Sequence, residues 1–320
     1  MTTISAQCIA KSQHADAPQH VLSTLLCRYP RWIHAEVMTH RMFSRNASSS
    51  RAVPVAKLIE DILRDPAAPM FWGKNQKGMQ AGEEHRATIG LNKEEPSGSR
   101  HSATLSREEA WLSAMNDAVS WAKLFATAGY HKQIVNRLLE PFSHITVVIS
   151  ATEWSNFLAL RDHPDAEPHI QLLAQRIREA IDGTEARILQ PGRWHLPFVS
   201  DEEQKGIFDE ATVGGSAGPR QYEEALDLAR KLSAARCAST SYKTVDGFDM
   251  TLERAVALHD KLVSEVPLHA SPMEHQAQAD RCAHHGMSGH LPQFHWENPS
   301  QHRNFRGFRQ YRAMLPGERQ

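Results

Sequence analysis

Ile145-Thr-Val-Val-Ile-Ser-Ala-Thr-Glu153 joins a strand pattern directly to a helix start, and it indicates the fold class more clearly than any other segment. Residues 145–149 are all apolar or β-branched, which predicts a buried strand. Ser150-Ala-Thr-Glu153 has the Ser-x-x-Glu spacing of a capping box and predicts a helix that ends near Arg161. A strand that passes at once into a helix is typical of α/β proteins.

The remaining chain alternates helical and strand-like segments in the same way. Val21–Arg28 is predicted to be a strand that Pro30 ends. Further helices are expected at Arg31–Phe43, 54–66, Ser106–Gly129, His131–Glu140, Ile170–Ile181, 221–238 and 251–263. A long loop is expected at 72–105, and mostly irregular structure from Pro272 onward. We expect an α/β (α+β) fold with a mixed sheet flanked by helices.

Composition limits the classes of partner. The 320 residues include 36 Lys+Arg against 37 Asp+Glu, so there is no basic excess of the kind that coats nucleic acid polymers. The four cysteines are few and unpatterned, which is typical of reduced thiols in a cytoplasmic protein. No secretory segment or long apolar run is present, so we expect no association with a membrane.

Residues 39–51, Thr-His-Arg-Met-Phe-Ser-Arg-Asn-Ala-Ser-Ser-Ser-Arg, take the expected helix into a serine-rich turn. The three consecutive serines offer hydroxyl and backbone N–H donors. Arg41 and Arg51 add permanent positive charge in a planar fork that suits phosphate. The segment therefore predicts an anion site, although an ordinary helix end with surface arginines has the same composition.

This segment resembles the signature of the flavin-dependent thymidylate synthases, which is Arg-His-Arg followed by Ser-x-Asn and Ser-x-Arg. Two positions depart from the family pattern. Thr39 stands where the family has its first arginine, and Ala47 replaces an acidic residue. Either change can alter which nucleotide the site accepts.

Two further segments match the family in the same order. Trp154-Ser-Asn-Phe-Leu-Ala-Leu-Arg161 resembles the second signature, Asn-Phe-Leu-x-Leu-Arg. Arg137 falls where the family has a nucleotide-binding arginine on the preceding helix. Taken alone, Arg137 is also compatible with an ordinary surface arginine. Three segments in a shared order are much harder to obtain by chance.

The resemblance implies a role for each matching residue. The nucleotide would be bound by Glu36, Ser48, Ser49, Arg51, Arg137 and Arg161. Within this set Ser49 would lie near the pyrimidine and Arg161 would hydrogen-bond the base, which makes these two the expected catalytic residues. The flavin would be lined by His40, Arg41, Asn46 and Asn156. Because Asn156 and Arg161 lie roughly 140° apart on an ideal helix, they need not face the same ligand.

The family's remaining element, His-x-Thr/Ser-Pro-x-Glu-His, matches His269-Ala-Ser-Pro-Met-Glu-His275 far downstream. His269 and Ser271 are therefore expected flavin contacts. A weaker match, His14–His20, lies in the family's usual upstream place but lacks the Pro and Glu at the right offsets. The downstream match follows 235–241 and the helix 251–263, which resemble the family's N-terminal lead-in.

This displaced order predicts a circularly permuted fold, which is feasible where domain termini lie close together. Residues 1–212 would form the nucleotide- and flavin-binding core, with an insertion at about 52–105. Residues 220–320 would be the permuted segment that completes the same domain and flavin site. Gly214–Pro219 is the expected linker.

The implied activity is reductive methylation of dUMP at C5, using FAD, NADPH and methylenetetrahydrofolate, in a homotetramer with active sites between subunits. No cysteine here has the Pro-Cys-His setting of the cysteine-dependent thymidylate synthases. Two alternatives remain. One is hydroxymethylation or another C5 modification of dUMP or dCMP, and the other is a nucleotide-binding protein without catalysis.

A histidine-rich region near the C-terminus raises a metal hypothesis. Cys282-Ala-His-His285 is followed by His290, His295 and His302. This spacing matches no standard zinc pattern, so a polar histidine-rich loop is the favoured interpretation and no metal site is expected.

Overall fold

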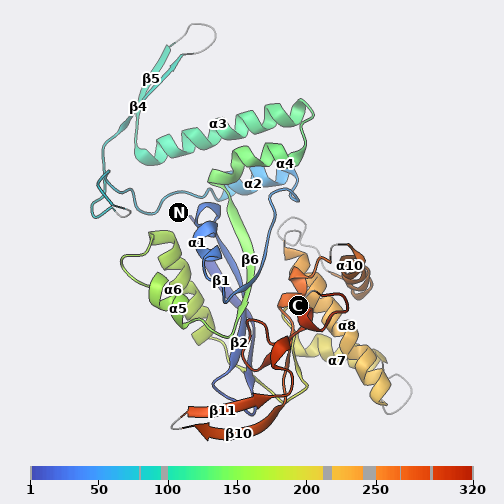
Figure 1. Ribbon diagram of the computed structural model, residues 1–320. Helices are drawn as coiled ribbons and strands as arrows, with labels where there is room; N and C mark the ends of the chain where they lie inside the picture. The colour runs from blue at the N-terminus through green and yellow to red at the C-terminus, as the bar shows by residue number, and fades with distance from the viewer. Residues whose placement is uncertain are drawn as a thin grey trace.

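A five-stranded mixed sheet lies at the centre of the computed structural model, with helices on both sides (Figure 1). The structure describes residues 2–78, 81–94, 100–211, 218–240, 250–266, 268–288 and 291–318. The strands, in the spatial order β3-β6-β2-β1-β7, are Ser44–Ala47, His144–Ala151, Val21–Pro30, Ser5–His14 and Arg187–Leu189. β1 and β7 run parallel, and the other neighbours are antiparallel. The predicted α/β class with a mixed, helix-flanked sheet is confirmed.

The two strands predicted from apolar runs form the middle of this sheet. β6 is buried along almost its whole length, as expected for a strand covered on both faces. β1 was not predicted, because polar residues such as Lys11 and Gln13 interrupt its pattern. β1 and β2 form a hairpin, and the weaker flavin motif at His14–His20 is the connection between them, with the His14 side chain fully buried.

One face of the sheet is covered by three helices: α1 (His34–Met38), α5 (Ser155–Arg161) and α6 (Pro168–Asp182). Their apolar side chains pack with those of β2 and β6 in the largest core cluster. The Glu167 carboxylate caps α6 by accepting the backbone N–H groups of His169 and Ile170. α6 ends at Gly183, as predicted.

A second layer lies across one end of the sheet. It contains α2 (Val55–Arg64), α3 (Arg107–Thr127), α4 (Lys132–Val135) and the 3-10 helix η2 (Asn136–Phe142), which pack around their own apolar cluster. The capping box predicted at Ser106 is confirmed. The helix expected at 131–140 is α4 continued by η2, which runs past Pro141. The loop expected at 72–105 is wrong in its second half, because β4 (Ile89–Glu94) and β5 (Arg100–Leu105) form a hairpin that extends beyond α3 (Figure 1).

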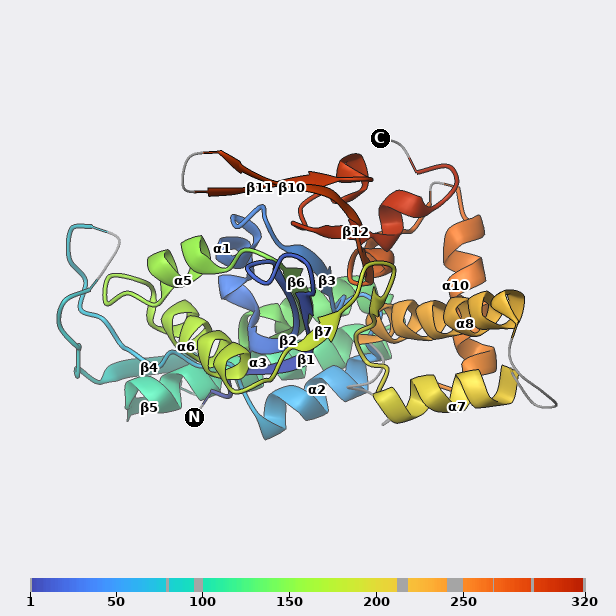
Figure 2. The same cartoon turned by 90° about the horizontal axis from the view of Figure 1, so that it is seen from below.

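The C-terminal part packs on the side of the sheet opposite α5 and α6 (Figure 2). Helices α8 (Pro219–Ala238) and α10 (Leu252–Ser264) confirm the prediction, whereas α7 (Asp201–Ala211) was missed. The prediction of mostly irregular structure after residue 272 is wrong. The segments there are η3 (Ser271–Glu274), β9 (Ala277–Ala279), β10 (Cys282–Ser288), β11 (Leu291–Trp296), η4 (Pro299–Gln301), β12 (Phe308–Gln310) and η5 (Tyr311–Met314). β9 pairs with β12 and with β8 (Trp194–His195), and β10 pairs with β11. The linker expected at 214–219 lies outside the described residues except for Gly218 and Pro219.

Two predicted helix boundaries are wrong, each for a local reason. The helix expected at Arg31–Phe43 is a 3-10 turn, η1 (Arg31–Ile33), followed by α1, which ends at Met38. There the Arg45 guanidinium donates to three carbonyls, those of Val37, Met38 and His40, at 3.1–3.2 Å. A side-chain cation at these last carbonyls ends the helix and lets the chain turn into β3.

The capping box expected at Ser150–Glu153 is also wrong. Ser150 is the buried penultimate residue of β6, and α5 begins only at Ser155. Trp154 is the N-cap of α5 and makes no side-chain capping bond, while the Glu153 carboxylate, one residue earlier, accepts the backbone N–H of Ser155 at 3.0 Å.

A buried chain of hydroxyl and imidazole groups connects the sheet to the C-terminal part. Ser12 Oγ lies 2.8 Å from His195 Nδ1, and His195 Nε2 lies 2.8 Å from Thr24 Oγ1. Thr24 Oγ1 lies 2.6 Å from Ser150 Oγ, which lies 2.9 Å from His275 Nδ1. All five side chains are at most 4% exposed. The chain joins β1, β2 and β6 to β8 and to the end of η3 through hydrogen bonds that have no competing water.

Burial lowers the pKa of both His195 and His275 from 6.5 to about 3, with a smaller contribution from His275 to the shift at His195. As the pH falls below 6.5, these two histidines therefore bind protons in the unfolded chain but not in the folded chain. Because of this difference, the free energy of unfolding decreases as the pH decreases in that range. His275→Gln keeps an amide that can hydrogen-bond Ser150 but removes one titrating ring. We expect it to reduce the slope of the free energy of unfolding against pH by up to about 1.4 kcal/mol per pH unit. Urea denaturation from pH 7 downward measures it. The exposed His163→Gln is the control, and equal slopes in both variants would contradict the account.

Candidate active site

The serine-rich turn follows β3 and is held from behind by α4 and η2. Asn136 Nδ2 donates to the carbonyls of Ser50 and Val53 at 2.7 and 2.9 Å. Lys132 Nζ donates to the Ala52 carbonyl at 2.8 Å. Asn136 is fully buried, so these bonds replace water for backbone carbonyls that the turn leaves without a strand partner. No motif in the sequence points to Asn136.

The turn presents different serines to different sides. Ser48 Oγ accepts the backbone N–H of Thr146 at 3.0 Å, and Ser48 and Ser50 line a cavity of about 190 Å³. Arg51 lines another cavity, of about 530 Å³, with which the first shares no residue. Ser49 lines neither of these two cavities, and its carbonyl accepts the N–H of Ala52 at 3.0 Å. Ser48, predicted to bind the nucleotide, therefore faces away from the cavity that Arg51 lines.

Arg51 and Arg137 line the same cavity, as their predicted shared role requires. The remaining lining residues are Phe125, Gln133, Ile134 and Leu138. Arg137 donates to Glu140 at 3.0 Å, and Glu140 accepts Ser50 Oγ at 2.6 Å. An exposed ion pair of this type contributes at most about 1 kcal/mol, so Glu140 is a weak competitor for an anionic ligand. Two guanidinium groups over an apolar floor suit a phosphate attached to an organic body.

A second cluster of predicted residues surrounds Arg161. Its Nη1 pairs with Glu36 at 3.1 Å, and its Nε donates to His40 Nε2 at 3.1 Å. His40 must therefore accept at Nε2, which fits a neutral ring. Burial, followed by the charges of Arg161 and Arg45, lowers the His40 pKa in the same direction. Glu36 thus contacts Arg161 directly.

His40, Arg41, Asn156 and Arg161 line one cavity of about 360 Å³, together with the rings of Phe43 and Phe157. The His40 ring meets the Phe157 ring edge-on, with centroids 4.9 Å apart. Asn156 and Arg161 reach this common space although they start from different faces of α5. The cavity combines amide, imidazole and guanidinium groups with aromatic surface, which is suited to a flat heteroaromatic ligand that carries an anion.

The two clusters are separate within one chain. The cavity of Arg51 and Arg137 and the cavity of His40 and Arg161 have no lining residue in common. The structure therefore groups the predicted residues in two sets and does not bring all of them into one pocket.

Asn46 is one of the residues through which the C-terminal part contacts the segment 39–51. Its Nδ2 donates to the Cys237 carbonyl at 2.7 Å, and its Oδ1 lies 3.5 Å from Ser271 Oγ. His269, predicted as a flavin contact beside Ser271, is instead exposed and pairs with Glu265 at 3.1 Å. Asn46 and Ser271 are thus brought together, whereas His269 lines none of the cavities described here.

Residues that the sequence did not single out add a fourth cavity, of about 440 Å³, which shares Arg41 and Phe43 with the cavity of His40. It is lined also by Ser44, Glu274, Arg303, Asn304, Gln310, Arg312 and Glu318. Asn304 Nδ2 donates to the Met42 carbonyl at 3.0 Å, and Gln310 Nε2 donates to Ser44 Oγ at 3.0 Å. These amides hold the turn that carries Arg41. They were missed because the segment has no helix or strand periodicity.

Two further features concern the metal hypothesis and a possible membrane span. Within the described ranges, no group of three or more His, Cys, Asp or Glu side chains is arranged to hold a metal ion, and His290 of the metal hypothesis lies outside those ranges. His302 pairs with buried Asp280 at 2.9 Å. No helix in the described part of the chain has the length and apolar character needed to cross a membrane.

Comparison with known proteins gives one family match. The model of the family described as thymidylate synthase complementing protein matches residues 3–183, which is more than half of the chain. No curated protein sequence matches the chain.

Three solved structures show a weak likeness. The UMP/dUMP methylase PolB from Streptomyces cacaoi bound with 5-Br UMP is 14% identical over 57% of this chain and 91% of that chain, with a TM-score of 0.40. Its complex with 5-Br dUMP is 13% identical over the same shares, with a TM-score of 0.38. The flavin dependent thymidylate synthase ThyX from Helicobacter pylori, complexed with FAD and dUMP, is 16% identical over 52% of this chain and 70% of that chain, with a TM-score of 0.33. Because these TM-scores are low, the family match carries the comparison.

Asn136→Ala tests whether this amide holds the serine-rich turn. Because the carbonyls of Ser50 and Val53 lose their donor, we expect the free energy of unfolding to fall by about 2 kcal/mol. Urea denaturation measures the change. The exposed Asn116→Ala on α3 is the matched control and should stay within about 0.5 kcal/mol of the wild type. Equal losses in the two variants would mean that the turn does not depend on Asn136.

Proposed function

Because the chain belongs to the thymidylate synthase complementing protein family, that of the flavin-dependent thymidylate synthases, we propose that it reductively methylates dUMP at C5. The observation that carries this proposal is that Arg51 and Arg137 line one cavity together, and that His40 and Arg161 line another. These are the residues that the family resemblance assigns to the nucleotide and the flavin. The proposed cosubstrates are NADPH and methylenetetrahydrofolate, and the proposed location is the cytoplasm.

The nucleotide roles follow from the charges. Arg51 and Arg137 bind the phosphate dianion, since two guanidinium forks supply parallel N–H donors. Ser49 lies on the pyrimidine side in this proposal. Arg161 hydrogen-bonds the base, and its Nε contact with neutral His40 fixes the plane of the guanidinium. Arg161 and Ser49 are thus the proposed catalytic residues.

The residues around His40 fit a flavin. The cavity of about 360 Å³ shares Arg41 and Phe43 with the one of about 440 Å³, and in this proposal the dinucleotide spans both. His40, Arg41 and Asn156 would hold it, with Asn46 and Ser271 at the edge. When bound, FAD supplies reducing equivalents, while methylenetetrahydrofolate supplies the carbon. The three cavities used in this proposal contain no cysteine among their described residues, in keeping with a reaction that needs no thiolate.

A homotetramer with active sites between subunits is also proposed, on the ground that one chain holds the two residue clusters apart. The helices beside Arg51 and Arg137 expose large apolar side chains: Trp121 and Leu124 are 59% exposed, and Ile134 is 49% exposed. Such a face favours covering by another chain. A second subunit would bring its own Arg161 cluster toward the Arg51 cluster.

Circular permutation is proposed from the contacts of Asn46. Segment 235–241, which resembles part of the family's N-terminal lead-in, and segment 269–275, which matches its flavin-binding motif, both reach this residue, through Cys237 and Ser271. In this proposal residues 1–212, with an insertion at about 52–105, form the core, and 220–320 complete the same domain.

A second candidate is hydroxymethylation or another C5 modification of dUMP or dCMP. The Glu36 carboxylate favours it, because a carboxylate accepts from the amino group of cytosine but repels a phosphate. The structure complicates this role, since Glu36 already pairs with Arg161 at 3.1 Å. A nucleotide-binding protein without catalysis is the remaining alternative. It predicts a colourless purified protein that flavin does not stabilise against heat.

Arg51→Ala and Arg161→Ala test the assigned nucleotide site. Each removes a charge-assisted donor, so each should weaken dUMP binding by about tenfold or more. Flavin should remain bound in Arg51→Ala, as its visible absorption will show, and calorimetry gives the dUMP affinity. Arg176→Ala, an exposed arginine of α6, is the control and should bind dUMP like the wild type. Unchanged dUMP affinity in both site variants would show that the assigned site is wrong.

Glu36→Gln separates the two substrates. Removing the negative charge frees the Arg161 guanidinium, so dUMP affinity should rise by about threefold or more, at the scale of a weak ion pair. The same calorimetric titration with dCMP is the comparison. A loss of dCMP affinity together with unchanged dUMP affinity would favour the dCMP alternative.

A further inference from the structure

A small polar cavity of about 190 Å³ lies behind the serine-rich turn, between the turn, η1, β6 and α2. Ser48 and Ser50 line it from the turn, and Arg28, Arg31 and His144 line it from the sheet side. It shares no residue with the cavity of Arg51 and Arg137. Of the residues that the family resemblance assigns to the nucleotide, Ser48 lines this cavity, but the proposed function places no ligand in it.

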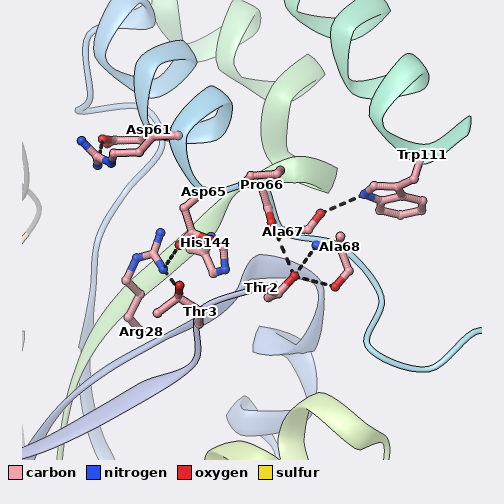
Figure 3. Close-up of polar contacts among 11 residues, drawn as sticks. Thr2, Thr3, Arg28, Asp61, Asp65, Pro66, Ala67, Ala68, Trp111 and His144 are labelled. Atoms are coloured by element: carbon pink, nitrogen blue, oxygen red, sulfur yellow. Dashed lines mark hydrogen bonds and ion pairs between the residues drawn. The ribbon is translucent and has the colours of Figure 1, made fainter. Parts of the chain in front are cut away.

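The charges around this cavity do not cancel. Arg28 Nη1 pairs with Asp65 at 2.6 Å and also reaches the Thr3 carbonyl at 3.3 Å (Figure 3). Arg64 pairs with Asp61 at 2.5 Å. Arg31 is the third arginine, and its Nε reaches Ser143 Oγ at 3.3 Å. Among the residues that the structure describes, Arg31 forms no ion pair, so its positive charge is opposed only through space, chiefly by Glu140.

Burial makes this charge costly. It lowers the pKa of the Arg31 guanidinium below its usual range, and the opposing charge of Glu140 only partly reverses the effect. A guanidinium that is partly removed from water and lacks a carboxylate partner is stabilised by an anion that enters its cavity.

His144 offers a second, independent sign of a ligand. Its side chain is 4% exposed and lines the cavity, and its Nε2 has no hydrogen-bond partner in the described structure. Its Nδ1 lies 3.9 Å from the Asp65 carboxylate, beyond hydrogen-bond reach, while the charge and the backbone of Asp65 act to raise the pKa of the ring (Figure 3). Burial, with the charge of Arg28 as the next cause, lowers the His144 pKa to about 4, so the ring is neutral at pH 7. A neutral ring with its proton on Nε2 donates one hydrogen bond into the cavity.

The size of the cavity selects among anions. Pockets for organic ligands usually begin at about 300 Å³, so a whole nucleotide is too large for this space. A tetrahedral oxyanion is small enough, and its oxygens can accept from a guanidinium and an imidazole N–H at once.

We propose that this cavity is a second anion site, which binds inorganic phosphate or an oxyanion of similar size through Arg31 and His144 Nε2. The site lies on the opposite face of the serine-rich turn from Arg51. It is independent of dUMP and flavin, and therefore of the proposed function.

Calorimetric titration of the full chain with inorganic phosphate tests the proposal. The titration uses an Arg137→Met background, which weakens phosphate capture at the proposed nucleotide site. We expect phosphate to bind and to raise the melting temperature in this background. Adding Arg31→Met should raise the phosphate Kd by about tenfold or more, whereas adding the exposed Arg176→Met should leave it unchanged.

A second variant protects the test against misfolding. His144→Phe keeps the ring volume and removes the Nε2 donor, so it should weaken phosphate binding without lowering the melting temperature in phosphate-free buffer. Competition identifies the source of the anion: dUMP should not displace phosphate in the Arg137→Met background. Absence of phosphate binding there, an unchanged Kd in Arg31→Met, or displacement by dUMP would each overturn the proposal. Failure of dUMP to bind the wild-type chain would bear only on the proposed function.

Discussion

The buried hydrogen-bonded chain from Ser12 to His275 is the constraint on which the rest of the structure depends. It ties three strands of the sheet to segments that lie far away in the sequence, at 195 and 275. Because no water reaches these groups, a shift of one segment would leave several donors and acceptors unsatisfied. The end of η3 is therefore fixed against β6, and Ser271 is fixed beside Asn46. The hydrogen-bonded chain thus holds the C-terminal part where its residues line the cavity of about 440 Å³ together with Arg41.

The serine-rich turn uses the same principle on a smaller scale. Asn136 replaces water at two carbonyls, and the turn then presents Arg51 to one cavity and Ser48 to another. The Ser49 carbonyl accepts the N–H of Ala52, so the chain turns here and its side chains reach different cavities. Arg41 and Arg51 predict an anion site in the sequence, whereas the positive charge at the cavity of Ser48 comes from residues outside the segment, such as Arg31. Positive charge therefore lies on both faces of the turn and does not by itself show which face binds the nucleotide.

The sequence predicts the elements whose local signals agree with the tertiary structure. β2, β6, α3, α6 and α8 have clear apolar runs, caps or terminal glycines, and all of them form. Ser150 shows where such signals fail: its capping pattern is genuine, but the buried partners Thr24 and His275 take the hydroxyl into the sheet. The helix end at Met38 depends on Arg45, seven residues later, and the strands after 272 depend on partners that no local pattern specifies. For the site, family motifs identified residues that do share cavities, whereas Asn136, Arg31 and Gln310 have roles that only contacts distant in sequence reveal.

C5 modification of a pyrimidine deoxynucleotide by this chain with a bound flavin is measured by mass spectrometry of the nucleotide products. The chain is incubated with dUMP or dCMP, FAD, NADPH and methylenetetrahydrofolate. We expect dUMP to gain the mass of one methylene group, in a reaction that requires both the flavin and the folate. Recovery of both nucleotides unchanged by a folded, flavin-loaded protein would show that the chain does not catalyse this reaction.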